Sequence, residues 1–220
     1  MNLSYCKVLV WDAPTRLFHW LTVVLVIAAY TTWRMNLMDW HAWTGDTLLA
    51  LLLFRLLWGF FGSETARFSA FLASPRAAAL QLADGLRREP DRQVGHNPAG
   101  GWMVLLLLAF LLAETLTGIY VANDVANEGP LTELVPAPIA NLITDLHLYF
   151  WDALVGAVIL HVLAILVYAV AKRHNLLTPM ITGHKTLPQD VKRPRLAGAA
   201  RAALLFGCSA LAAAALANFL

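Results

Sequence analysis

Two histidines lie fourteen residues apart within one apolar stretch, the residues from Leu146 to Ala171. In an α-helix, fourteen residues rotate by about 1400°, or four turns less about 40°, and rise by about 21 Å. His147 and His161 therefore leave one face of the predicted helix at two depths of a hydrocarbon core about 30 Å thick. Ionisable side chains inside membrane spans are rare and usually functional. We therefore expect both imidazoles to bind a cofactor.

The composition is that of a membrane protein. Of the 220 residues, 59% are hydrophobic and only 14% are charged, whereas a soluble domain carries about 25% charged residues. The two cysteines, Cys6 and Cys208, are far apart, and neither belongs to a Cys-x-x-Cys-His motif. A disulfide framework and covalent attachment of a c-type haem are therefore both unexpected. The N-terminal residues lack the pattern of a signal peptide.

Five apolar segments are long enough to be membrane-spanning helices. The predicted spans are residues 17–33, 41–61, 102–121, 146–171 and 197–220, each bound being approximate. The first four form a predicted four-helix transmembrane bundle within a domain of residues 1–186. A basic linker and the fifth span make up residues 187–220. The predicted fold class is thus an all-α membrane protein, a haem-binding bundle with one additional C-terminal helix.

Basic and acidic residues separate onto different loops. Five arginines lie between the second and third spans, and six basic residues lie between the fourth and fifth. Residues 122–145 contain no lysine or arginine but four carboxylates, Asp124, Glu128, Glu133 and Asp145. Cytoplasmic loops carry an excess of lysine and arginine. We therefore predict a multi-pass protein of the bacterial inner membrane, with its N-terminus in the cytoplasm and its C-terminus in the periplasm.

This topology assigns a depth to each of four histidines. His19 opens the first span and lies toward the cytoplasm, as does His161. His41 opens the second span and lies toward the periplasm, as does His147. Two pairs at two levels fit two bis-histidine b haems, because a zinc site needs three or four ligands at one point. The alternative is four unrelated packed or interfacial histidines, which requires both depth matches to be coincidental.

Several other residues are candidates for haem contacts. Arg16 and Arg55, at the cytoplasmic ends of two spans, could pair with the propionates of the inner haem, and Arg34 with those of the outer haem. Gly45 and Gly156 could let a porphyrin approach the backbone. Ordinary positive-inside arginines and helix packing through small residues explain the same positions equally well.

Two residues are candidates for a quinone site. His96 and Asn97 lie where the chain re-enters the membrane, near the predicted inner haem. A quinone headgroup needs one or two hydrogen-bond partners beside an apolar slot, although a histidine in a loop is more often solvated. Glu114, within the third span, would either relay protons or bond neighbouring threonines, because a carboxylate there is costly unless it faces the bundle.

Four stretches of the sequence form longer motifs. They are Val10-Trp-Asp-Ala-Pro-Thr-Arg-Leu-Phe-His-Trp20, Phe54-Arg-Leu-Leu-Trp-Gly-Phe-Phe-Gly62, Gly95-His-Asn-Pro-Ala-Gly-Gly-Trp-Met103 and Met180-Ile-Thr-Gly183. With the His147–His161 spacing, they resemble the bacterial cytochrome b561 family, in the branch of nickel–iron hydrogenase b-type cytochrome subunits. The resemblance covers about residues 7–186 and implies two b haems in a four-helix core. It implies the same four ligands, His19, His41, His147 and His161, as well as electron exchange with quinone.

The sequence therefore predicts a di-haem cytochrome that carries electrons between the quinone pool and a periplasmic partner, expected to be a c-type cytochrome. One alternative is an enzyme, since relatives in such a family oxidise superoxide and reduce quinone. Superoxide is an anion and needs a positive approach, whereas the outer loop is acidic. A second alternative is a haem-containing membrane anchor of a redox complex. No nucleic-acid partner is expected, and the oligomeric state stays open.

Overall fold

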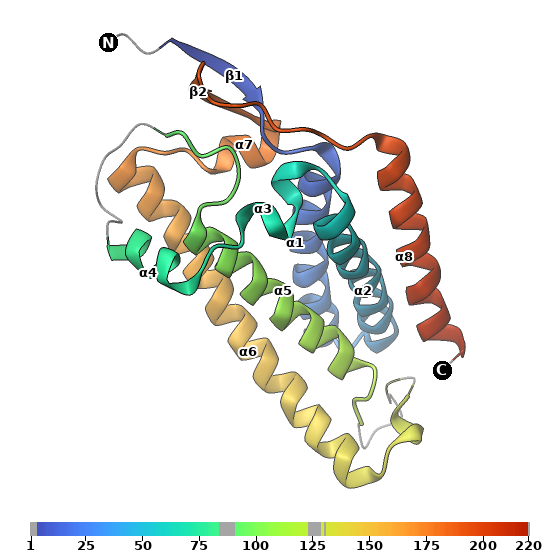
Figure 1. Ribbon diagram of the computed structural model, residues 1–220. Helices are drawn as coiled ribbons and strands as arrows, with labels where there is room; N and C mark the ends of the chain where they lie inside the picture. Colours follow the sequence, from blue (N-terminus) through green and yellow to red (C-terminus); the bar gives the residue numbers. More distant parts are fainter. Residues whose placement is uncertain (1–3, 84–90, 123–128, 130, 220) are drawn as a thin grey trace. The chain divides into compact units, whose positions relative to one another are not determined.

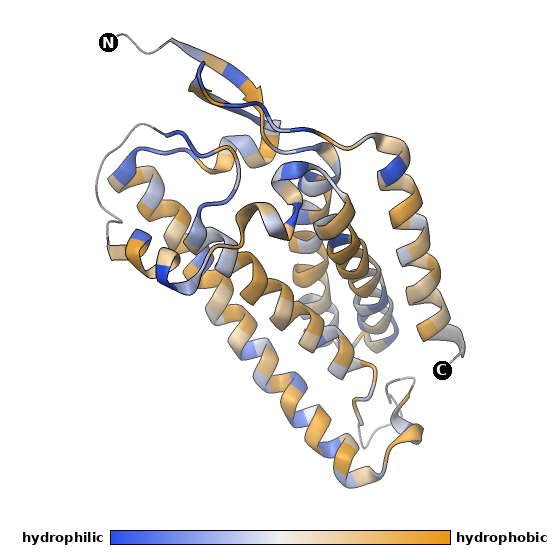
Figure 2. Ribbon diagram, viewed as in Figure 1, coloured by the Kyte–Doolittle hydropathy of each residue, from blue (hydrophilic) through white to orange (hydrophobic). Residues whose placement is uncertain are grey.

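The computed structural model describes residues 4–83, 91–122, 129 and 131–219, and five long helices dominate it (Figure 1). These helices are α1 (Ala13–Arg34), α2 (Met38–Phe61), α5 (Pro98–Gly118), α6 (Ala137–Val167) and α8 (Ala199–Phe219). All five are long and apolar enough to cross a membrane, and Figure 2 shows that apolar residues predominate along them. The prediction of an all-α membrane protein with five candidate spans is confirmed.

Shorter elements connect the long helices. They are β1 (Tyr5–Leu9), the 3-10 turns η1 (Glu64–Ala66) and η2 (Thr132–Leu134), α3 (Phe68–Phe71), α4 (Pro75–Ala83), the π-helical segment η3 (Tyr168–Lys172), α7 (Leu177–Thr182) and β2 (His184–Pro188). Asp124 and Glu128 of the acidic loop lie outside the described residues.

Helix α6 begins nine residues earlier than predicted, at Ala137 instead of Leu146. Prolines are tolerated in the first turn of a helix, so Pro138 is compatible with this early start. The Thr144 hydroxyl donates to the carbonyl of Ala140 at 2.9 Å within the added turns. Asp145 is therefore a residue of α6, and its assignment to the loop was wrong.

Tertiary contacts divide the chain into two compact units. Unit 1 contains Met1–Leu17, Leu57–Leu106 and Ala157–Ala202. Unit 2 contains Phe18–Leu56, Leu107–Gly156 and Ala203–Leu220. Each of the five long helices contributes one part to each unit. The separate division into residues 1–186 and 187–220 stays a prediction.

In unit 1, two strands from distant parts of the chain form an antiparallel pair, with Cys6 opposite Leu187 (Figure 1). Val8 and Leu187 are almost completely buried, and they form a core with Val10 and Trp11. The sequence pattern does not predict this sheet. Its two strands are only five residues long, and the partner of β1 lies about 180 residues away in the chain.

Gly183 links this sheet to the start of α1. Its carbonyl accepts hydrogen bonds from the backbone N–H groups of Val10 and Trp11 at 2.8 and 3.1 Å. Its φ of 83° lies in the region that glycine adopts without strain. A Cβ atom at this position would lie 2.7 Å from the Leu9 side chain and 2.8 Å from the Trp11 carbonyl oxygen. Both the conformation and the space therefore favour glycine.

Asp12 joins the start of α1 to the end of α2. Its Oδ1 accepts the backbone N–H of Thr15 at 2.8 Å, which caps the first turn of α1. Its Oδ2 accepts the indole N–H of Trp58 at 3.1 Å. Trp58 has no exposed surface, and Asp12 is 5% exposed. One buried carboxylate therefore satisfies two buried donors.

Unit 2 has its own apolar core. Leu49 of α2 packs with Ile119 and Leu131, which follow α5 in the sequence, and Leu216 of α8 joins this cluster. The segment after α5 is also held by the Thr144 hydroxyl, which accepts the backbone N–H of Ala122 at 3.0 Å. These contacts fix the end of α5 against α6, where the candidate site lies.

Candidate cofactor site

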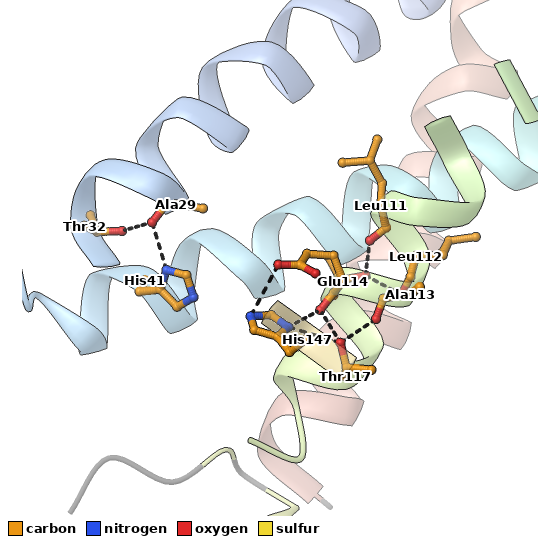
Figure 3. A network of polar contacts seen from close by, with 10 residues as sticks. Ala29, Thr32, His41, Leu111, Leu112, Ala113, Glu114, Thr117 and His147 are labelled. Atoms are coloured by element: carbon orange, nitrogen blue, oxygen red, sulfur yellow. Dashed lines mark hydrogen bonds and ion pairs between the residues drawn. The ribbon is translucent and has the colours of Figure 1, made fainter. Parts of the chain in front are cut away.

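Unit 2 brings together His41 of α2 and His147 of α6 (Figure 3). Their ring centroids are 6.5 Å apart, and the two ring planes are nearly perpendicular at 89°. Both side chains are half-buried. These are the two histidines that the predicted topology pairs at the periplasmic level.

A backbone carbonyl contacts Nδ1 of each ring. Nδ1 of His41 lies 2.9 Å from the carbonyl oxygen of Ala29 in α1. Nδ1 of His147 lies 3.0 Å from the carbonyl oxygen of Glu114 in α5. A carbonyl only accepts hydrogen bonds, so each Nδ1 must donate its hydrogen. In a neutral imidazole this leaves the Nε2 lone pair available for a metal ion.

The last turn of α5 forms a cradle for His147 (Figure 3). The Thr117 hydroxyl oxygen lies 3.1 Å from Nδ1 of His147. The same hydroxyl donates to the Ala113 carbonyl at 2.6 Å, so its oxygen is left to accept the imidazole N–H. A Cβ atom on Gly118 would lie 3.2 Å from Cε1 of His147. The Thr-Gly pair therefore provides both a partner and space for the ring.

Glu114 also faces His147. One of its carboxylate oxygens lies 3.5 Å from Nε2 of His147, and its side chain is 14% exposed. The other carboxylate oxygen is buried and has no hydrogen-bond partner among the described residues. The Thr117 hydroxyl lies 3.1 Å from the backbone carbonyl oxygen of Glu114. The choice between proton relay and bonding to threonines stays open for the Glu114 carboxylate.

The pair fits a bis-histidine haem. An imidazole nitrogen binds a metal at about 2 Å, and its ring centre lies roughly 1 Å further away, so two axial rings are about 6 Å apart. The observed centroid separation is 6.5 Å. No cluster of three or more metal-ligating side chains occurs in the described part of the chain, as a zinc site would require. A Cβ atom on Gly45, one turn beyond His41, would contact nothing within 4 Å, so the space beside this glycine is open.

The two other predicted haem ligands belong to different units. His19 lies in the part of α1 that belongs to unit 2, and His161 in the part of α6 that belongs to unit 1. Both are half-buried. Their pairing at the cytoplasmic level stays a prediction.

The three candidate propionate partners differ in their surroundings. Arg16 donates to the carbonyl of Ile181 at 2.6 Å and so joins α1 to α7 within unit 1. Arg55 is only 3% exposed, which is unusual for an arginine unless it is paired. Arg34 is exposed at the end of α1, with its guanidinium carbon 5.7 Å from the Trp33 ring centroid. A role toward haem propionates stays a prediction for all three.

His96 and Asn97 both lie in unit 1. The His96 ring packs against Trp11 and Phe71, with centroid distances of 4.7 and 4.9 Å. The Asn97 side-chain oxygen accepts the backbone N–H of Gly100 at 2.7 Å and caps α5. His96 is therefore half-buried between two aromatic rings, and a role toward quinone stays a prediction for both residues.

Tyr168 completes this cluster and was missed by the sequence analysis. Its hydroxyl accepts the amide N–H groups of Asn97 at 2.8 Å and of Gln81 at 3.1 Å. A sequence signal was present, because Tyr168 lies seven residues after His161. Seven residues of an α-helix make two turns less about 20°, so a helix that continues past His161 is expected to carry both side chains on one face.

Comparison with known proteins identifies the family. Residues 10–183 match the family described as prokaryotic cytochrome b561. The chain belongs to this family. This cytochrome is also 23% identical, over 219 residues, to a "probable Ni/Fe-hydrogenase B-type cytochrome subunit" from Rhodobacter capsulatus, covering 84% of this chain and 83% of that protein. No solved structure matches the chain. The family resemblance predicted from the motifs is confirmed.

This cytochrome b561 is therefore a multi-pass b-type membrane cytochrome that functions in electron transport. Several residues of its longer motifs build unit 1. Asp12 bonds Trp58, Gly183 bonds Val10, and a Cβ atom on Gly101 would lie 2.7 Å from the Phe71 carbonyl. Much of the recognisable sequence thus has a structural role.

Proposed function

We propose that this cytochrome binds two b haems and carries electrons across the bacterial inner membrane, between the quinone pool and a periplasmic redox partner. The proposed orientation has a cytoplasmic N-terminus and a periplasmic C-terminus, as the distribution of basic residues favours. The main support is the pairing of His41 and His147, 6.5 Å apart, with both Nδ1 atoms held by carbonyls. In this proposal, Nε2 of His41 and Nε2 of His147 bind one haem iron.

When bound, a b haem supplies one-electron chemistry. His41 and His147 would hold this haem, and ligation by two histidines would favour electron transfer over reactions at an open iron position. The carbonyls of Ala29 and Glu114 fix the ring orientations in advance, so little rearrangement is needed when the charge of the site changes. In the proposed scheme His19 and His161 hold the second haem. The helical rise of about 21 Å between His147 and His161 would then separate the two haems along the path of the electron across the membrane.

We place the quinone headgroup beside His96 and Asn97 in unit 1. Trp11 and Phe71 flank the His96 ring, and Asn97 and Tyr168 add an amide and a hydroxyl close by. An apolar slot with a few polar groups is typical of small-molecule sites. Tyr168→Phe removes only the hydroxyl, so we expect a KM for quinol raised about tenfold, near the 1.4 kcal/mol of one hydrogen bond. An unchanged KM would contradict this placement.

The periplasmic partner is proposed to be a c-type cytochrome, or a hydrogenase as the name of the Rhodobacter capsulatus relative suggests. Glu133 is exposed after α5, and Glu128 precedes it by five residues in the same acidic loop. Charges at such a surface act mainly on the encounter rate. With basic cytochrome c, neutralising Glu128 and Glu133 should slow the second-order rate at low salt and barely change it at high salt. Asp190→Asn, at the opposite predicted side, is the control.

Reduction by quinol tests the proposal against a purely structural role for the haems. The purified protein is mixed anaerobically with a short-chain quinol, and haem absorbance is followed by stopped flow. We expect reduction in the wild-type protein and a smaller amplitude in His147→Ala. A haem-containing anchor would show no reduction by quinol on this timescale, which would contradict the proposed function.

A further inference from the structure

Unit 1 contains a basic hollow at the end of α2. Its volume is about 180 Å³, well above the roughly 10–15 Å³ that one water molecule requires. Three arginines and one carboxylate give its lining a surplus of two positive charges, since three minus one is two. The lining residues are Glu64, Arg67, Arg195, Leu196, Ala197 and Arg201.

One wall of the hollow is the segment that precedes α8. The backbone N–H and carbonyl of Arg195 bond the carboxylate and backbone N–H of Glu64, both at 2.9 Å. The backbone N–H of Ala197 donates to the hydroxyl of Ser63 at 2.9 Å, and Ser63 is 1% exposed. These three bonds hold the segment in a defined position, so the wall is built by specific contacts.

Two arginines that line the hollow are hydrogen-bonded to the end of α2. Arg67 donates through Nε to the Gly62 carbonyl at 2.9 Å. Arg201 donates through one terminal nitrogen to the Phe61 carbonyl at 3.2 Å. The last carbonyls of a helix lack partners within the helix and attract cations. A guanidinium has five N–H donors, so one such hydrogen bond orients each side chain and leaves further N–H groups to bind an anion.

The hollow lies at a membrane boundary, because α2 and α8 are both candidate spans. Phe60 and Phe61, the last residues of α2, are 64% and 56% exposed. A second hollow shares Leu196 and includes Lys7 and Arg193 in its lining, so basic residues continue along the same edge. Basic pockets beside spanning helices are typical sites for anionic lipid headgroups.

We propose that this hollow binds the phosphate group of an anionic phospholipid. Arg67 and Arg201 contact the phosphate through their guanidinium groups, which match its geometry. Phe60 and Phe61 lie beside the acyl chains. The site shares no residue with the cofactor and quinone sites. The bound lipid would join the start of α8 to the end of α2 within unit 1.

Lipid retention by the full haem-loaded chain tests this proposal. The protein is purified in mild detergent, offered phosphatidylglycerol or phosphatidylcholine, and examined by native mass spectrometry. We expect preferential retention of phosphatidylglycerol. Each lost arginine should lower the affinity for phosphatidylglycerol about fivefold. The double variant Arg67→Gln with Arg201→Gln should therefore lower this affinity roughly 25-fold. Arg76→Gln, an exposed arginine of α4 that does not line the hollow, should leave retention unchanged.

Two further arms keep the test decisive. Arg195→Gln alters a side chain that is 87% exposed, so it should lower affinity about fivefold without loss of haem even if the double variant is unstable. Millimolar inorganic phosphate should not displace the lipid, and displacement would indicate a free-phosphate site instead. Equal retention of the two lipids, or equal losses in Arg76→Gln and Arg195→Gln, would overturn the proposal.

Discussion

Thr117→Val tests how the protein positions His147. The substitution keeps the side-chain shape but removes the hydroxyl oxygen 3.1 Å from Nδ1 of His147. The carbonyl of Glu114, at 3.0 Å, still holds the ring. A hydrogen bond to Nδ1–H makes an imidazole ligand more basic, which stabilises the oxidised haem. Losing one of two such acceptors should therefore raise the midpoint potential of the haem bound by His147.

The size of this shift follows from the energy of one hydrogen bond. Its net contribution is about 1 kcal/mol, and we assign roughly half to all of it to the difference between the oxidised and reduced states. For a one-electron couple, 59 mV corresponds to a tenfold change, or about 1.4 kcal/mol. The expected shift is thus about +20 to +40 mV. An anaerobic redox titration followed in the α-band measures it.

The chain offers a matched control in the same helix. The Thr115 hydroxyl donates to the Leu111 carbonyl at 3.0 Å, as the Thr117 hydroxyl does to Ala113 at 2.6 Å. Thr115 has no histidine contact among the described bonds. Thr115→Val should therefore leave both potentials unchanged. A negative shift in Thr117→Val, or equal shifts in the two variants with full haem content, would refute the reasoning.

Three more predictions concern single positions. Asp12→Ala should lower stability by about 2–4 kcal/mol, the sum of a lost helix cap and the buried, unsatisfied Trp58 donor, and thermal unfolding in detergent measures it; a loss below 1 kcal/mol would contradict this sum. Gly118→Val should remove one of the two haems by crowding His147, and full haem content would show that the space is not needed. A hydrogen bond from a backbone N–H lowers the pKa of Glu64, so this carboxylate stabilises the fold above its ordinary pKa and stops doing so as the pH falls through the lowered pKa. Below about pH 4, the unfolding temperature should therefore fall more steeply in the wild-type protein than in Glu64→Gln, and parallel curves would contradict this.

Hydropathy and helical periodicity predicted the parts of the fold that depend on local sequence. Five spans follow from apolar length, and the proximity of His41 and His147 follows from topology and depth. The early start of α6 was missed because Pro136 precedes it, Pro138 lies in its first turn and Asp145 follows, and these residue types are typical of loops. Proline is tolerated in the first turn of a helix, and the Thr144 hydroxyl joins this part of α6 to the backbone N–H of Ala122.

The features that the sequence did not predict depend on contacts between distant residues. Ala29 and Glu114 hold the histidines through backbone carbonyls. Every residue carries such a carbonyl, whatever its side chain. No residue type marks such a contact in advance. The β1–β2 pair joins Tyr5 to Pro188, a pairing that two five-residue strands do not specify by themselves. Tyr168 was predictable, because a helix that continues past His161 is expected to carry both side chains on one face.

The central claim is that His41 and His147 are the two axial ligands of one haem, in a protein that binds two. Haem content by pyridine haemochrome, combined with a redox titration, tests it most directly in the wild-type protein and in His41→Ala and His147→Ala. We predict two non-covalent b haems per wild-type chain, and one in each variant, with the same redox component missing from both. One haem or none per wild-type chain, or the loss of different components in the two variants, would contradict the claim.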